Sequence, residues 1–153
     1  MAVRASRSAF AYRRILVPLV ADGESGQAVA LAAELAADHG ASVTAVVVIE
    51  IPAELPLDAH MLEEERRARQ ALEVAQATCG AYGIRVKART LRARNAGEAI
   101  VDEAQARGTE LVVLVAPRAR LVGRRSRVFG QTVDYILKHA PCRVLVAALP
   151  VQA

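Results

Sequence analysis

The chain alternates five short strand-like runs with four helical repeats, and this order restricts the fold more than any other feature. The strand-like runs cover residues 13–20, 41–52, 84–93, 110–116 and 142–149. Between them, in residues 25–40, 60–83, 95–108 and 128–140, apolar side chains recur at helical spacing. Such alternation predicts parallel strands joined by right-handed crossovers, with helices on both faces of the sheet. We therefore expect an α/β fold, a single doubly wound, five-stranded parallel sheet of Rossmann-like type.

The length of 153 residues suffices for one domain and is too short for two. We expect residues 13–149 to form this domain and residues 1–12, which carry Arg4 and Arg7, to be a disordered basic tail. The tail lacks the apolar stretch of a secretory signal, and no run reaches the roughly 18 apolar residues that a membrane span needs. We therefore expect a cytoplasmic protein.

The runs differ in how they should be buried. Residues 13–20, 41–52 and 110–116 are almost wholly apolar, which is typical of parallel strands covered on both faces. We expect the same of residues 142–149. In contrast, residues 84–93 alternate apolar with charged side chains, which predicts an edge strand with one face exposed to solvent.

The long helical repeat, residues 60–83, has one apolar face and one charged face. The apolar face carries Met61, Ala68, Leu72, Ala75 and Cys79. On the charged face, the spacing predicts ion pairs between Glu63 and Arg67 and between Glu65 and Arg69, four residues apart.

Charge is distributed unevenly along the chain. The formal net charge is +4, yet residues 115–132 hold five arginines and no acid, and residues 1–14 hold four more arginines. The remainder is therefore net acidic. Residues 115–132 follow a buried run and precede a helix, at the sheet edge where ligands of such folds bind. This position favours a phosphate site, and the alternative is a solvated surface segment.

Several functional classes lack support in the sequence. We find no nucleophile with a matched base, and His39, His60 and His139 come without a second metal ligand at useful spacing. Cys79 and Cys142 show no CxxC spacing and read as buried thiols. Nucleic-acid binding is also disfavoured, because few aromatic residues accompany the arginines and no recognition motif is present. We expect neither an enzyme, a metalloprotein nor a nucleic-acid binder.

Two segments resemble the universal stress protein family. The opening "RRILVPLVADGESGQAVALAAELA" is similar to the family's first strand, Pro-x-Asp-Gly-Ser turn and helix. The closing "FGQTVDYILKHAPCRVLVA" is similar to its last helix and strand. The resemblance, which extends from about residue 13 to 148, implies a five-stranded parallel sheet and a homodimer formed through the last strand. In one branch of the family it also implies ATP bound by a Gly-x-x-Gly-x9-Gly-Ser/Thr loop.

The chain departs from the family's ATP-binding pattern. The adenine-binding Asp falls on Val20, for which Asp22 is a candidate substitute two residues later. The glycine pair falls on Pro117 and Arg120, or in a second register on Val115 and Arg118. Side chains at these positions would hinder the close approach of backbone N–H groups to a triphosphate.

We expect the arginines to replace the missing glycines and to bind an adenine nucleotide with forked contacts to its phosphates. The candidate ligands are cyclic di-AMP, AMP and ATP. A cyclic dinucleotide has the two-fold symmetry of a C2 dimer and no Mg²⁺-bound γ-phosphate. The candidate nucleotide-binding residues are Pro18, Leu19, Val20, Asp22, Val48, Ala116, Arg118, Arg120, Arg124, Arg125, Ser126, Arg127, Gly130, Gln131 and Thr132.

Two functional hypotheses follow from the resemblance. In the first, the chain is a non-catalytic, dimeric regulatory module that binds an adenine nucleotide and signals to a partner. The closing segment is similar to stress-protein domains that accompany bacterial membrane transporters, so a transporter is the expected partner. In the second, the chain is a ligand-free dimeric stress protein of the branch that lacks the ATP-binding loop.

Overall fold

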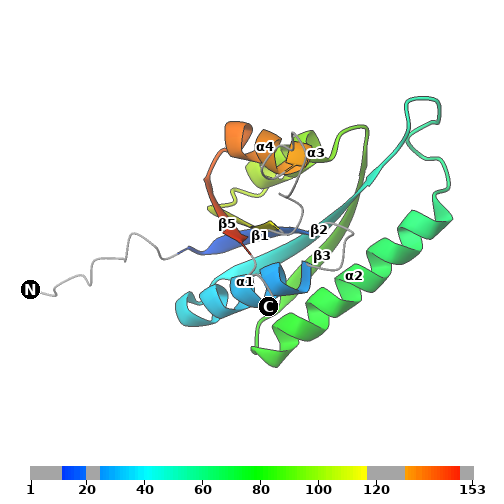
Figure 1. Cartoon of the computed structure of the whole chain (residues 1–153). Helices are drawn as coiled ribbons and strands as arrows, with labels where there is room; N and C mark the ends of the chain where they lie inside the picture. The colour runs from blue at the N-terminus through cyan, green and yellow to red at the C-terminus, as the bar shows by residue number, and fades with distance from the viewer. Residues whose placement is uncertain (1–11, 20–24, 117–129, 149–153) are drawn as a thin grey trace, which may run out of the picture.

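The computed structural model describes residues 12–19, 25–116 and 130–148, and these ranges form a parallel sheet flanked by helices (Figure 1). The elements in chain order are β1 (Arg14–Leu19), α1 (Ser25–His39), β2 (Ser42–Glu50), α2 (Leu62–Ala81), β3 (Val86–Ala93), α3 (Ala96–Ala106), β4 (Leu111–Ala116), α4 (Gly130–His139) and β5 (Arg143–Ala148). All pairings are parallel, in the order β3-β2-β1-β4-β5. The predicted doubly wound, five-stranded α/β fold is confirmed.

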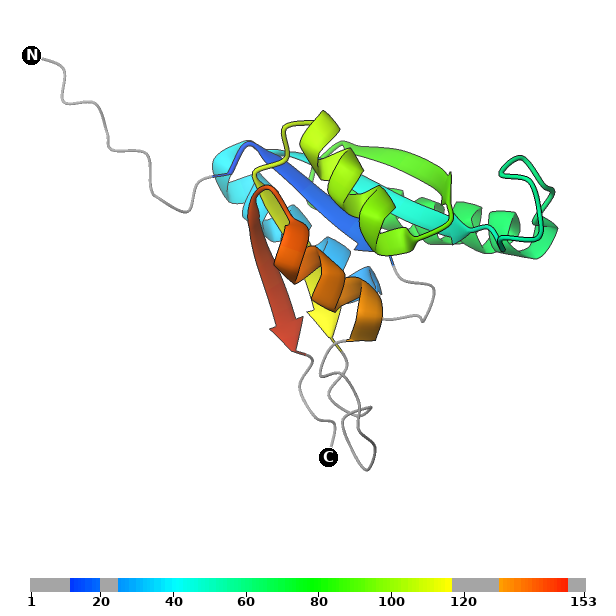
Figure 2. The ribbon, with the colours of Figure 1, turned by 90° about the horizontal axis from the view of Figure 1, so that it is seen from above.

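The direction of winding reverses at β1, which pairs with β2 on one side and with β4 on the other. Helices α1 and α2 cover one face of the sheet, and α3 and α4 cover the opposite face (Figures 1 and 2). The strands are parallel, so their carboxyl ends lie at the same end of the sheet. In folds of this kind, ligands bind at that end, where the winding reverses.

Each face of the sheet buries its own apolar cluster because successive strand side chains point to opposite sides. On the α1–α2 face, Val17 and Val43 pack with alanines of both helices. On the α3–α4 face, Leu16 and Val112 pack with Ile136 of α4. These five residues are between 0% and 1% exposed, which explains why the central runs carry almost no polar residue.

Helix α2 presents the predicted apolar face, with Ala68, Leu72, Ala75 and Cys79 buried. The prediction for its charged face is half right. Arg67 Nε lies 3.1 Å from Glu63 Oε1, as expected. The pair between Glu65 and Arg69 is wrong, because Glu65 accepts instead from Arg92 Nη1 of β3, at 2.7 Å. A long-range partner on the adjacent strand displaces the local one.

The two edge strands differ from each other in how well the sequence predicted them. Strand β3 lies at one edge and is partly exposed along its length, as predicted. Strand β5 was expected to be buried, and this is wrong: it forms the other edge. Its Val144 and Val146 pack on the α3–α4 cluster, whereas Leu145 is 37% exposed. The sequence of an apolar strand does not show whether a helix covers both of its faces or only one.

The expectations for the termini are tested only in part. Residues 1–11 and 149–153 lie outside the described residues, so the disordered tail stays a prediction. Tyr12 is described: it packs against the α1–α2 cluster, and its hydroxyl oxygen accepts from Arg143 Nη1 at 3.2 Å. Among the described helices, none has the length and apolar character needed to cross a membrane.

Candidate functional site

A cavity of about 640 Å³ lies where the carboxyl ends of β1 and β2 meet the first turns of α1, α3 and α4. Helix α2 forms its remaining wall. Most of the lining side chains are apolar, and they come from helices on both faces of the sheet. Residues from both faces can line one cavity only beyond the ends of the strands. The cavity therefore occupies the place where doubly wound folds bind ligands.

Three residues that the sequence singled out meet in this cavity. Leu19 ends β1, Val48 lies near the end of β2, and Thr132 is in the first turn of α4. Val48 is half-buried against the α3–α4 cluster, so part of its side chain faces the opening. These residues are 29 or more positions apart in sequence, and the topology brings them together.

Four other candidate residues are described but do not line the cavity. Pro18 is buried within β1, Ala116 ends β4, and Gly130 and Gln131 begin α4, where both are exposed. Eight candidates lie outside the described residues: Val20, Asp22, Arg118, Arg120, Arg124, Arg125, Ser126 and Arg127. Their proposed role as nucleotide ligands stays a prediction.

Gly130 has a backbone conformation that supports its place at the start of α4. Its φ of +80° lies in the left-handed region, which glycine adopts without the strain that a Cβ introduces. The first turn of α4 holds no acidic residue. Among the described residues of this turn, no acid therefore competes with an anion for the N–H groups and the positive end of the helix dipole.

The first turn of α3 is arranged in the opposite way. Asn95 caps it, with its Oδ1 accepting from the Glu98 backbone N–H at 2.9 Å. Glu50, the last residue of β2, accepts from the Ala96 N–H at 3.1 Å through its Oε1. A carboxylate of the protein itself thus occupies the place where an external anion would bind α3.

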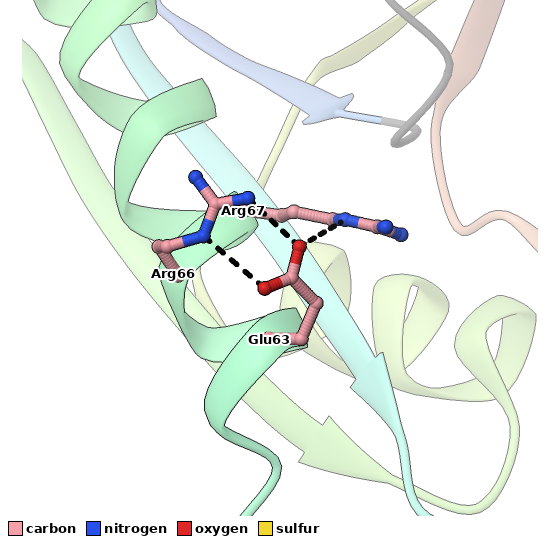
Figure 3. Close-up of polar contacts among 3 residues, drawn as sticks. All are labelled: Glu63, Arg66 and Arg67. Carbon is pink, nitrogen blue, oxygen red and sulfur yellow. Dashed lines mark hydrogen bonds and ion pairs between the residues drawn. The ribbon is translucent and has the colours of Figure 1, made fainter.

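Helix α2 contributes charged residues to the cavity wall, among them Arg67, for which the sequence predicted an ion pair with Glu63 and no part in the site. Figure 3 shows Glu63 between two arginines of the same helix: Arg66 Nη2 lies 2.7 Å from its Oε1 and Arg67 Nε lies 3.1 Å from the same oxygen. The hydrogen bond from Arg66 is the main reason that the pKa of Glu63 is lowered, and Arg67 adds to it. The positive charge of Arg67 is therefore partly compensated by Glu63.

A second, smaller cavity of about 410 Å³ adjoins the first and is lined by Glu50, residues 51–53 and Arg94. Arg94 Nη1 donates to the carbonyl oxygens of Ile51 at 3.3 Å and Leu55 at 2.7 Å, and also to that of Pro52. Arg94 is thus occupied with holding the segment between β2 and α2.

Other lining residues also escaped sequence reasoning, including Ala96 and Ile100 of α3 and Ala71 and Val74 of α2. Nothing local distinguishes an alanine that faces a cavity from one that faces a core, so no sequence signal could have found them. Glu50 differs, because an acid that directly ends an apolar strand at the ligand edge is a visible signal.

The described lining is suited to a ligand that is partly apolar and partly polar. It combines apolar walls with the polar or charged groups of Glu50, Glu64, Arg67, Gln70 and Thr132. Within the described ranges, no three histidine, cysteine, aspartate or glutamate residues converge to hold a metal ion.

Comparison with known proteins gives a consistent result. The family model described as "Universal stress protein family" matches residues 11–148. Among curated protein sequences, no significant match is found. Universal stress protein UspA from Lactobacillus plantarum superposes with a TM-score of 0.71 at 25% identity, covering 89% of this chain and 97% of that one.

Two further solved structures are complexes with nucleotides. A universal stress protein in complex with cAMP gives a TM-score of 0.69 at 18% identity, covering 90% of this chain and 98% of that one. The universal stress protein from Archaeoglobus fulgidus in complex with dAMP gives the same TM-score and identity, covering 89% and 98%.

Proposed function

Because the chain belongs to the universal stress protein family, we propose that it is a non-catalytic regulatory module that binds an adenine nucleotide at the carboxyl edge of its sheet. The observation that carries the proposal is the 640 Å³ cavity in which Leu19, Val48 and Thr132 come together. Ligand pockets for small molecules range over about 300–1,000 Å³, and their walls are mostly apolar. Two solved structures of similar fold bind cAMP and dAMP, which share the adenine base.

The phosphates would lie at the first turn of α4, where Gly130 and Thr132 stand and no acid opposes an anion. The arginines between residues 118 and 127 would add charge-assisted, forked hydrogen bonds from the segment that precedes α4. Without the family's glycine pair, this arrangement suits phosphodiesters better than a Mg²⁺-bound triphosphate. Cyclic di-AMP is therefore the ligand that we propose first, ahead of AMP and ATP.

The proposed role is regulatory because the described cavity wall contains the carboxylates of Glu50 and Glu64 but no hydrogen-bonded pair of nucleophile and base. A homodimer formed through the exposed edge strand β5 would place two nucleotide sites in one symmetric molecule. We further propose that the nucleotide-bound dimer signals to a membrane transporter, as the closing segment suggests.

Calorimetric titration with ATP, AMP, cAMP and cyclic di-AMP, each with and without Mg²⁺, tests the proposal. We expect Mg²⁺-independent binding, with one cyclic di-AMP per dimer. Replacing Arg124 and Arg125 together by Ala should abolish this binding without unfolding the protein. The control is Arg66→Ala, which removes an exposed arginine of α2 that does not line the cavity.

The remaining outcomes contradict the proposal in distinct ways. An absence of heat with every nucleotide would favour the ligand-free dimer. Tight binding of ATP only in the presence of Mg²⁺ would contradict the replacement of glycines by arginines. Binding of any DNA or RNA with a steep salt dependence would indicate a nucleic-acid binder instead.

A further inference from the structure

We infer that Glu50 fixes the direction in which the nucleotide lies, with its nucleoside end against β2 and α3 and its phosphate end at α4. This inference rests on the proposed function and deepens it. Glu50 lies at the junction of both cavities and at the end of the strand that also carries Val48.

The first turn of α3 is closed to phosphate because the protein has already placed an anion there. Glu50 Oε1 lies 3.1 Å from the Ala96 backbone nitrogen, and the side chain of Asn95 satisfies the Glu98 N–H. A phosphate at this end would displace or face a carboxylate, and like charges at such short range repel. The first turn of α4, by contrast, holds no acid.

The second oxygen of Glu50 is the feature that recognises the nucleoside. Within the described residues, no group donates a hydrogen bond to it. Glu50 is exposed, so water can satisfy this oxygen when no ligand is bound. An ionised carboxylate only accepts hydrogen bonds, and a donor of the ligand can therefore replace that water. A nucleoside offers such donors in the exocyclic amine of adenine and in the ribose hydroxyls. Val48, two residues earlier on the same side of the strand, supplies the apolar contact for the base.

The other charged groups of the described wall agree with this direction. Glu64 adds a second carboxylate on the α2 side, and Arg67 is hydrogen-bonded to Glu63 at 3.1 Å. Arg94, beside Glu50 in the smaller cavity, donates to backbone carbonyls. The two carboxylates, Glu50 and Glu64, thus balance the two guanidinium groups, and this end of the cavity is close to neutral, which suits the uncharged part of a nucleotide.

The test is the affinity of AMP for the wild-type protein and for Glu50→Gln. The glutamine oxygen can still accept from the Ala96 N–H, while its amide group then points a donor toward the donors of the nucleoside. We expect the Kd of AMP to rise about tenfold or more, as for the loss of one charge-assisted hydrogen bond. Glu98→Gln is the matched control, because it removes an exposed carboxylate of the α3 first turn that does not line the cavity, and it should leave the Kd of AMP almost unchanged.

Two analogues identify which donor Glu50 binds. IMP lacks the exocyclic amine, and dAMP lacks the 2′-hydroxyl. The wild-type protein should bind one of them more weakly than AMP, and Glu50→Gln should remove that difference. Arg67→Ala should affect AMP and adenosine alike, because the phosphate lies at the other end.

The outcomes separate this inference from the proposed function. If the wild-type protein binds AMP and Glu50→Gln binds it equally well, Glu50 does not orient the ligand, and nucleotide binding itself stands. A loss of AMP binding but not of adenosine binding in Arg67→Ala would place the phosphate at α2 and overturn the orientation. If the wild-type protein binds none of the nucleotides, the proposed function and this inference both fail.

Discussion

At the scale of single residues, Arg92 of β3 joins three parts of the chain. Its Nε donates to the Leu57 carbonyl at 2.8 Å, its Nη2 donates to that of Ala59, and its Nη1 lies 2.7 Å from Glu65 Oε1. The planar guanidinium can satisfy these acceptors at once because its donors are arranged in a fork. Arg92 thereby fixes the segment that leads into α2, one wall of the proposed site.

We expect Arg92→Ala to lower the free energy of unfolding by about 1.5–3 kcal/mol, the range for a hydrogen bond that involves a charged group. Urea denaturation followed by circular dichroism measures this change. Arg66→Ala is the control, because Arg66 makes an exposed pair within one helix and its removal should leave the urea midpoint unchanged. Equal effects of the two changes would contradict the role that we assign to Arg92.

The loss caused by Arg92→Ala should also depend on pH. The hydrogen bond from Arg92 is the main reason that the pKa of Glu65 is lowered in the folded state. A lowered folded-state pKa stabilises the protein at neutral pH, and this contribution disappears as the pH falls through that pKa. The stability difference between wild type and variant should therefore shrink at about pH 3, below the usual pKa range of glutamate. A constant difference would show that the carbonyl contacts alone matter.

The two cysteines should react slowly, and to different degrees. Burial raises the pKa of both the Cys79 and the Cys142 thiol, so little of the reactive thiolate is present near neutral pH. Cys79 is fully buried and Cys142 is half-buried. In a disulfide-exchange assay with a chromogenic reagent, we expect Cys142 to react first and Cys79 only on unfolding, with Cys142→Ser identifying each phase. Rapid reaction of Cys79 in the native protein would contradict its burial.

At the scale of elements, α3 and α4 approach each other closely at Gly97. A Cβ added there would lie 2.9 Å from Cδ1 and 3.0 Å from Cβ of Tyr135. Tyr135 is three residues after Thr132, within the same helix, so a displaced Tyr135 would also shift the first turn of α4. The glycine is thus tied both to packing and to the proposed phosphate end.

We expect Gly97→Ala to destabilise the protein by about 1–3 kcal/mol, as overpacking of a core commonly does, and to weaken AMP binding. Gly80→Ala in α2 is the matched control. Nothing lies within 4 Å of a Cβ at that position, and alanine favours a helix by roughly 0.5–1 kcal/mol over glycine. Thermal unfolding and titration with AMP measure both effects. A Gly97→Ala protein as stable as Gly80→Ala would show that Tyr135 moves aside without cost.

Local patterns predicted the elements well because the relevant signals lie within single segments. The apolar runs that became β1, β2 and β4 and the buried face of α2 could all be read from spacing. The misplaced burial of β5 and the pair expected between Glu65 and Arg69 depend instead on neighbours distant in sequence. Glu65 does not pair with Arg69, because Arg92 of the neighbouring strand β3, 27 residues away in sequence, donates to it instead.

At the scale of the whole molecule, the sequence predicted where the site lies but only some of the residues that line it. Element order located the ligand edge, and it brought Leu19, Val48 and Thr132 to one cavity. The wall formed by α2 could not be predicted, because the angle at which that helix leaves the sheet follows from packing. The partial occupation of the α3 first turn by Glu50 depends equally on tertiary geometry.

Among the described residues, no strand pairs with the outer edge of β5, and this bears on the assembly of the protein. The edge strand is apolar, and Leu145 is 37% exposed although its neighbours Val144 and Val146 pack inward. Exposed apolar edges are aggregation-prone unless another chain or element covers them. A second copy, related by a two-fold axis, would bury Leu145 of both chains against one surface.

We therefore expect the protein to have a mass in solution of twice the 16.3 kDa of the chain when measured by light scattering after size exclusion. Leu145→Lys should shift it to the monomer, because burying two unpaired ammonium groups at the axis is costly. Leu57→Lys replaces a leucine of similar exposure in the segment before α2, far from β5 in the ribbon (Figure 1), and should leave the dimer intact. A monomeric wild-type protein, or a dimer that survives Leu145→Lys, would show that β5 is not the interface. The two-fold cyclic di-AMP site would then lose its structural basis, while binding of a mononucleotide within each chain would be unaffected.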